Sequence, residues 1–170
     1  MLPTGLRELM TTFSHAGRVE WIGVRPARDV PMQALTRVEA IADRGLAGDR
    51  TGDKARVGNK RQVTLIQAEH LDVIGRLLQL GVIEPALLRR NIVVADINLL
   101  VLKGQRFYIG ETLLEMTGEC HPCSKMEVQL GHGGYNAMRG HGGITARVVD
   151  GGDILLGATV VPAGPEPEQP

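Results

Sequence analysis

The chain has 170 residues, of which 43% are hydrophobic and 22% charged, and its formal net charge is zero. This length fits a single domain that can bury a hydrophobic core without disulfides or a structural metal. Zero net charge argues against a nucleic-acid partner, and aromatic residues at 3% leave few side chains to stack on bases. No run approaches the length of a membrane span, and residues 1–15 lack a signal-peptide pattern, so we expect a cytoplasmic protein with no membrane partner.

The first third of the chain predicts a helical extension followed by two strands. Residues 1–16 form an N-terminal extension, in which apolar residues at helical spacing predict a short helix over 2–14 that packs on the core. Alternating residues predict a strand over 17–24, and a second strand is expected over 35–42. The segment 43–54 is rich in glycine and charge and predicts a loop, in which Asp49 is expected to form an ion pair with Arg50.

The rest of the chain predicts mostly strands. Strands are expected over 62–66, 92–94, 144–149 and 158–161, a hairpin over 106–117 that turns at Gly110-Glu111, and a turn at 150–153. A helix is expected over 67–80 with Gly81 as its C-terminal cap, and a shorter one over 84–89. Residues 162–170 predict a disordered tail. About seven to nine short strands without regular helical alternation favour a mainly β fold, a mostly antiparallel β-barrel with inserted helices.

The chemistry of the chain is concentrated in the segment Cys120-His121-Pro122-Cys123, which holds both cysteines and lies near Lys125. Two cysteines without a signal peptide indicate a reducing compartment and a chemical role for the thiols. Three interpretations are open: a dithiol redox pair, a zinc site completed by His132 or His141, and a single thiolate that acts as nucleophile or metal ligand. The glycines after Cys123 predict a mobile loop instead of a helix, which counts against the redox pair.

Several segments, in this order and spacing, resemble the MOSC domain, the module named after the C-terminal region of molybdenum-cofactor sulfurases. The resemblance extends from about residue 17 to 161 and is closest to the stand-alone bacterial members. It implies a β-barrel and a role in molybdenum-cofactor chemistry or sulfur transfer. The segments that carry it are 45–50, 61–66, 89–92, 104–110, Pro122-Cys123, and 142–144 through 151–154.

The resemblance implies that Cys123 is the reactive cysteine, either as a ligand to molybdenum or as a persulfide carrier. A molybdopterin ligand is an anion with a phosphate, so donors to phosphate and to the pterin edge are expected beside it. The candidate cofactor-binding residues are Arg50, Arg61, Arg89, Arg90, Asn91, His132 and His141.

We therefore expect a molybdenum-cofactor-related module that binds molybdopterin or carries sulfur, as a component of a sulfur-transfer or molybdenum-dependent reductase system. Its expected partners are a molybdenum-cofactor enzyme or a desulfurase that donates sulfur, and a homo-oligomer is compatible with the sequence. No lysine lies in a context suited to pyridoxal phosphate. The alternatives are a zinc or dithiol redox domain that uses Cys120 and Cys123 together, and a non-catalytic interaction domain.

Overall fold

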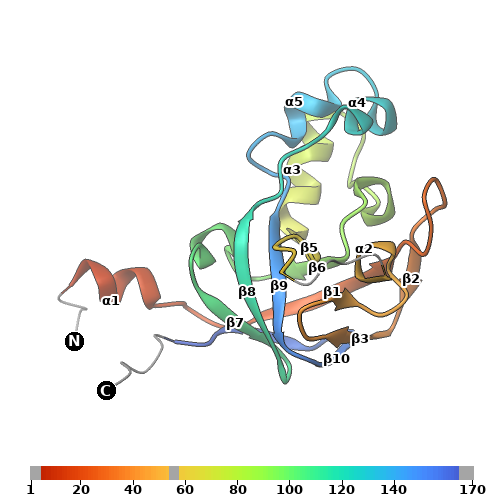
Figure 1. Cartoon of the computed structure of the whole chain (residues 1–170). Coiled ribbons are helices and arrows are strands. Elements are labelled where there is room, and N and C mark those ends of the chain that lie inside the picture. Colours follow the sequence, from red (N-terminus) through yellow and green to blue (C-terminus); the bar gives the residue numbers. More distant parts are fainter. Residues whose placement is uncertain (1–4, 54–57, 165–170) are drawn as a thin grey trace.

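The computed structural model describes residues 5–53 and 58–164. A seven-stranded β-barrel forms its centre (Figure 1). The strand order is β11-β7-β8-β9-β5-β6-β1, and β1 closes the barrel by pairing Gly17 with Val160 and Arg18 with Thr159 of β11. Every neighbouring pair is antiparallel except β5 and β6, so the predicted mainly β, mostly antiparallel barrel is confirmed. The barrel strands are β1 (Gly17–Val24), β5 (Val63–Gln67), β6 (Ile92–Ala95), β7 (Arg106–Ile109), β8 (Thr112–Glu119), β9 (Ile144–Asp150) and β11 (Thr159–Pro162).

A smaller three-stranded sheet lies beside the barrel and corrects one prediction. It contains β3 (Arg37–Ile41), β4 (Gly45–Leu46) and β10 (Gly152–Leu155), and the short β2 (Gln33–Leu35) pairs with β1. The strand predicted over 35–42 is β3, and β2, which contains only Leu35 of that range, is an additional strand. The turn predicted at 150–153 is wrong beyond Gly151, because Gly152 already pairs with Ala40 of β3. A Cβ at Gly151 would lie 2.7 Å from the Ala40 carbonyl oxygen, so the glycine permits this close approach.

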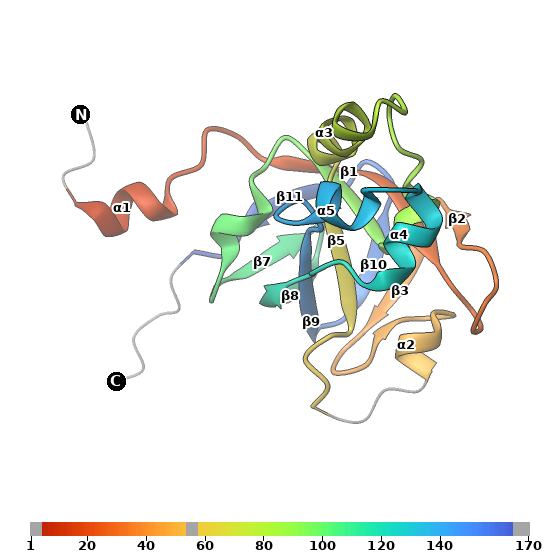
Figure 2. The ribbon, with the colours of Figure 1, turned by 90° about the horizontal axis from the view of Figure 1, so that it is seen from above.

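The helices lie mainly on one side of the barrel (Figures 1 and 2). The predicted helix over 67–80 is α3 (Ala68–Leu78), but its left-handed cap residue is Gln79, with φ of 57°, and not Gly81. The predicted segment 84–89 is the 3-10 helix η1 (Pro85–Leu88). The remaining helices are α1 (Leu6–Thr11), α2 (Arg50–Asp53), α4 (Ser124–Leu130), α5 (Gly134–Met138) and the 3-10 helix η2 (Leu99–Leu102).

Helices α4 and α5 replace the mobile glycine-rich loop expected after Cys123. They are linked by Glu127, whose carboxylate accepts hydrogen bonds from the backbone N–H groups of Gly133 and Tyr135, each at 2.8 Å. Gly131 and Gly133 both have φ of 85°, so the glycines form the tight connection between two helices. The loop prediction was wrong because each helix is short and is stabilised by packing that a local pattern does not show.

Two hydrophobic cores explain why the central strands are apolar on both faces. All four residues of β6 are buried, with Ile92 and Val94 in the barrel core and Val93 in a second core under the helices. The second core also receives Ile74 from α3 and Met126 from α4. This helical layer fixes the segment that follows β8, and that segment contains both cysteines.

Helix α1 departs from the packing predicted for the N-terminal extension. None of its residues is buried, and Leu6, Leu9 and Met10 are exposed. Phe13, after the helix, packs against the barrel core. The ribbon shows α1 projecting away from the barrel (Figure 1). In the part of the chain that the structure describes, no helix has the length and apolar character needed to cross a membrane. The predicted tail begins within β11 at Pro162, and residues 165–170 lie outside the described part.

Candidate functional site

The two cysteines face a common cavity of about 390 Å³, here called the thiol cavity. It lies between the barrel and helix α4, and segments distant in sequence contribute to it. Five cationic side chains and a single carboxylate line it, so its charge is strongly positive. The lining residues are Arg25, Met32, Asp49, Thr51, Arg61, Thr64, Arg89, Arg90, Asn91, Cys120, His121, Cys123, Lys125 and Met126.

The cysteines differ in exposure although only two residues separate them. Cys120 follows β8 and is 4% exposed, and its N–H donates to the carbonyl of Gly143 at 2.9 Å. Cys123 is exposed and forms the N-cap of α4, where its carbonyl accepts from Met126 N–H at 2.9 Å. The pair therefore does lie at a strand-to-helix junction, and the prediction that no helix follows Cys123 was wrong. Exposure makes Cys123 the more accessible nucleophile.

Arg90 holds the cysteine segment in place and does not donate into the cavity. Its side chain is buried, and Nε donates to the Gly142 carbonyl at 2.7 Å. One terminal nitrogen donates to Leu88 at 2.8 Å and the other to Cys120 at 3.3 Å, again to carbonyl oxygens. Burial lowers the pKa of Arg90, and the two thiols act in the opposite direction. Arg90 therefore has a structural role, and because it also lines the thiol cavity, its predicted binding of phosphate stays a prediction.

Gly142 and Gly143 allow this close packing behind the cysteine segment. A Cβ at Gly142 would lie 2.2 Å from the carbonyl oxygen of Cys120. Gly143 has φ of 87°, and a Cβ there would lie 1.9 Å from the Leu65 carbonyl oxygen. Both positions therefore require glycine, and the glycine pair noted in the sequence supports the cavity wall.

Asn91 and Asp49 form a second structural network at the base of the cavity. Asn91 Oδ1 accepts from the N–H and the hydroxyl of Thr64, at 3.1 and 3.0 Å, and its Nδ2 donates to Asp49 at 3.2 Å. The Asp49 carboxylate also accepts from the backbone N–H groups of Arg25 at 2.9 Å and Thr51 at 3.0 Å. Asp49 thus orients its loop through N–H groups in place of the expected ion pair with Arg50.

Four cations remain available to a ligand: Arg25, Arg61, Arg89 and Lys125. In the part of the chain that the structure describes, none of these four side chains has a hydrogen bond or an ion pair. Arg61 and Arg89 were predicted from the sequence. Arg25 was missed because it follows β1 in an ordinary proline-containing loop, and Lys125 was considered only as a neighbour of Cys123. Only the fold brings these four residues from separate segments to one cavity.

Three predicted cofactor-binding residues do not line the thiol cavity. Arg50 donates its backbone N–H to the Arg25 carbonyl at 2.8 Å, but it is not among the residues that line the cavity. His132 is fully exposed in the connection from α4 to α5, 3.9 Å from Glu127. His141 contacts His70 of α3, with ring centroids 5.2 Å apart, and Nδ1 lies 3.1 Å from the Ala137 carbonyl. None of the three is among the residues that line the thiol cavity, and their predicted binding of the cofactor stays a prediction.

The described residues also offer no protein-only site for a metal ion. They contain no group of three or more His, Cys, Asp or Glu side chains that could hold one. The zinc alternative needed His132 or His141 beside the cysteines, and both histidines lie elsewhere. A metal bound here would therefore need further ligands from a cofactor.

The closed β-barrel with a helical layer and a cationic thiol cavity is the architecture to compare with known proteins. The MOSC domain matches residues 52–161, and the chain belongs to this family, which is associated with molybdenum-cofactor-related function. Among solved structures, the YuaD protein from Bacillus subtilis is similar, with a TM-score of 0.73 and 20% identity over 86% of this chain and 94% of that one.

YiiM proteins share the same fold. YiiM from Escherichia coli has a TM-score of 0.65 and 17% identity, covering 87% of this chain and 70% of that one. YiiM from Geobacillus stearothermophilus has a TM-score of 0.68 and 15% identity, covering 86% and 75%. A comparison with curated proteins finds no match.

Proposed function

We propose that this protein binds an anionic molybdenum cofactor in the thiol cavity, with the sulfur of Cys123 as a ligand to the metal. One observation carries the proposal: an exposed thiol opens into a cavity lined by four cations that have no partner in the described chain. Membership of the MOSC family supports the choice of cofactor. We also propose that the domain extends over 17–161, because β1 starts at Gly17 and completes the barrel.

The donor set fits a molybdopterin group. Arg61 and Arg89 would bind its phosphate, because a guanidinium pairs with phosphate through two parallel hydrogen bonds. Arg25 and Lys125 would compensate the remaining negative charge. Cys123 would supply the soft sulfur that molybdenum accepts from protein, and the bound metal would supply redox chemistry.

Sulfur transfer is the second candidate, and the exposure of Cys123 favours it. The Cys123 thiolate would attack the outer sulfur of a donor persulfide, R–S–SH. The bond between the two donor sulfurs breaks, a new sulfur–sulfur bond forms on Cys123, and R–S⁻ leaves. The proton of the outer sulfur stays with it, so the product is the Cys123 persulfide and no further oxidant is consumed. A desulfurase that donates sulfur is the partner this candidate implies.

The test compares variants of the two cysteines. After incubation with free molybdenum cofactor, Cys123→Ala should retain no molybdenum. After treatment with a persulfide donor, it should not show the mass increase of about 32 Da that one added sulfur gives. Cys120→Ala should retain both. Metal content, pterin fluorescence and intact mass are the measurements. Equal loss in both variants, or a reversible disulfide between Cys120 and Cys123 in the wild type, would favour the dithiol alternative.

Charge variants test the cationic part of the site. Arg61→Gln and Arg89→Gln should each weaken retention of the pterin by about tenfold, the effect of losing one charge-assisted contact of about 1.4 kcal/mol. Arg76→Gln is the matched control, because Arg76 lies on α3, is exposed and forms an ion pair with Asp72 at 2.8 Å. No pterin retention in the wild type, together with thiols that do not load sulfur, would favour the non-catalytic interaction domain.

A further inference from the structure

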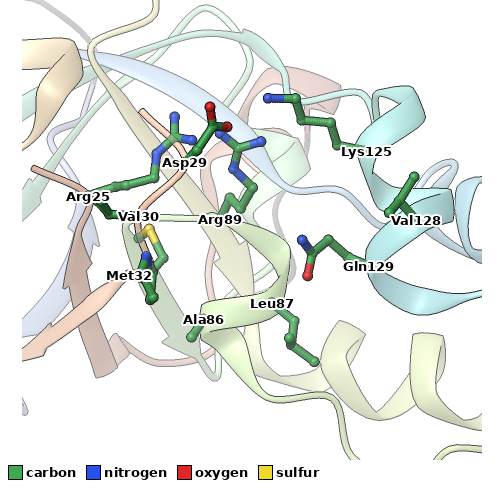
Figure 3. A pocket seen from close by; sticks show the side chains of 11 residues that line it. Arg25, Asp29, Val30, Met32, Ala86, Leu87, Arg89, Lys125, Val128 and Gln129 are labelled. Atoms are coloured by element: carbon green, nitrogen blue, oxygen red, sulfur yellow. The ribbon is translucent and has the colours of Figure 1, made fainter. Parts of the chain in front are cut away.

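A second hollow of about 580 Å³, here called the side groove, adjoins the thiol cavity (Figure 3). Its volume is that of a small-molecule site. The two hollows share Arg25, Met32, Arg89 and Lys125, so they meet along one cationic border. The side groove is formed by the loop between β1 and β2, by η1 and by α4.

Away from that border the side groove is mainly apolar, with Asp29 and Gln129 as its polar residues. Val30, Leu87 and Val128 line it, and each is an exposed hydrophobic side chain from a different segment. Val128 is 83% exposed, on the solvent side of α4. Single exposed apolar residues are ordinary, but three that converge on one concave surface provide a binding face for an apolar group.

The charges of the side groove are unequal from one end to the other. In Figure 3 the charged ends of Arg25, Arg89 and Lys125 lie toward one end of the view, while Leu87 lies toward the other. Asp29 also lies toward the charged end, so three cations face one carboxylate there. That carboxylate is already paired with Arg28 at 3.6 Å. The charged end therefore has an excess of positive charge that an anion would complement.

We infer that the side groove binds a small amphipathic anion, a molecule with one phosphate or carboxylate on an apolar body. The anionic group lies at the border beside Lys125, and the body lies against Val30, Leu87 and Val128. This places the polar end of the molecule beside the opening to Cys123. The inference rests on the proposed function for the chemistry at Cys123 and adds the class of substrate that reaches it.

Binding of two phosphates that differ only in their apolar body tests this inference. We expect 1-naphthyl phosphate to bind the wild-type protein about tenfold more tightly than methyl phosphate, as measured by calorimetry. The double variant Leu87→Ser/Val128→Thr should bring this ratio close to one without changing the affinity for methyl phosphate. The matched control Leu77→Ser/Val82→Thr changes two equally exposed residue types outside the groove and should keep the ratio.

A third variant separates the two ends of the site. Lys125→Gln should lower the affinity for both phosphates by a similar factor and leave the ratio of the two affinities unchanged. Binding of 1-naphthoate in place of 1-naphthyl phosphate shows whether a carboxylate is sufficient. Equal affinities for the two phosphates in the wild type, or a ratio that survives in Leu87→Ser/Val128→Thr, would overturn the inference. Neither result depends on Cys123, so failure of the groove is distinguishable from failure of sulfur loading or metal binding at the thiol.

Discussion

Replacement of Arg90 by methionine tests whether this residue supports the site or binds its ligand. The variant keeps most of the side-chain volume and removes all the donors. Two of the three lost hydrogen bonds are well formed, at 2.7 Å to Gly142 and 2.8 Å to Leu88, and the bond to Cys120 is longer at 3.3 Å. A bond from a charged donor contributes about 1.5–3 kcal/mol, so the loss of the two well-formed bonds amounts to roughly 3–6 kcal/mol.

Part of that loss is offset. Burial lowers the pKa of Arg90, which means that the protein interior destabilises its charged form, and methionine removes this cost. We therefore expect Arg90→Met to lower the free energy of unfolding by about 2–4 kcal/mol, a large share of the roughly 5–15 kcal/mol of a typical domain. Urea unfolding measures it, with the midpoint shifted and the slope preserved.

Arg89→Met is the matched control, because it is the adjacent arginine and its guanidinium has no partner among the described residues. Its unfolding free energy should change by no more than about 0.5 kcal/mol. A thiol reagent provides a second measurement: Arg90→Met should expose Cys120 and accelerate its labelling, whereas Arg89→Met should not. If the two variants were equally stable, with Cys120 equally protected, the structural role of Arg90 would be refuted.

Two further predictions concern stability. Burial and the neighbouring His141 lower the pKa of His70 below its ordinary 6.5, so the unfolded chain binds more protons as pH falls below about 6.5. The free energy of unfolding should therefore decrease from that pH down to the folded pKa, less so in His70→Gln, and an unchanged slope would contradict this. Gly142→Ala should cost about 1–3 kcal/mol through overpacking. Gly118→Ala, whose Cβ would meet nothing nearer than Thr145 at 3.7 Å, is its control, and equal costs would count against the steric argument.

Part of the barrel was predictable because β8 alternates in a simple way and its hairpin with β7 has a short turn. β8 alternates buried and partly exposed residues from Thr112 to Thr117, and the two-residue turn at Gly110-Glu111 fixes its hairpin with β7. Helix α4 was missed for the opposite reason. Its seven residues contain only two buried side chains, Met126 and Leu130, so no strong helical period is visible. Pairing of β10 with β3 connects residues more than a hundred positions apart, which a local pattern does not indicate.

The site was predictable in its residue types and less so in their roles. Arg89 and Arg90 look equivalent in the sequence, but Arg89 has φ of 58° at the end of η1. This left-handed residue turns the chain, so Arg89 faces the cavity while Arg90 is directed inward to three carbonyl oxygens. A backbone reversal of this kind is set by the packing of η1 and β6, and the sequence pair alone does not assign which arginine is buried.

The difference between Arg90, which stabilises the protein, and Arg89, which faces the cavity, extends to the other residues of the site. It determines how variants at these positions should be interpreted. Arg90, Asn91 and Asp49 use their polar atoms on the protein itself, so their loss should act first on the free energy of unfolding. Arg61, Arg89, Arg25 and Lys125 face the cavity and have no partner in the described chain, so their loss should act on ligand affinity with little effect on folding. A survey of these seven positions that measured only activity would merge the two groups. Measured together, stability and affinity distinguish the residues that build the cavity from those that bind in it.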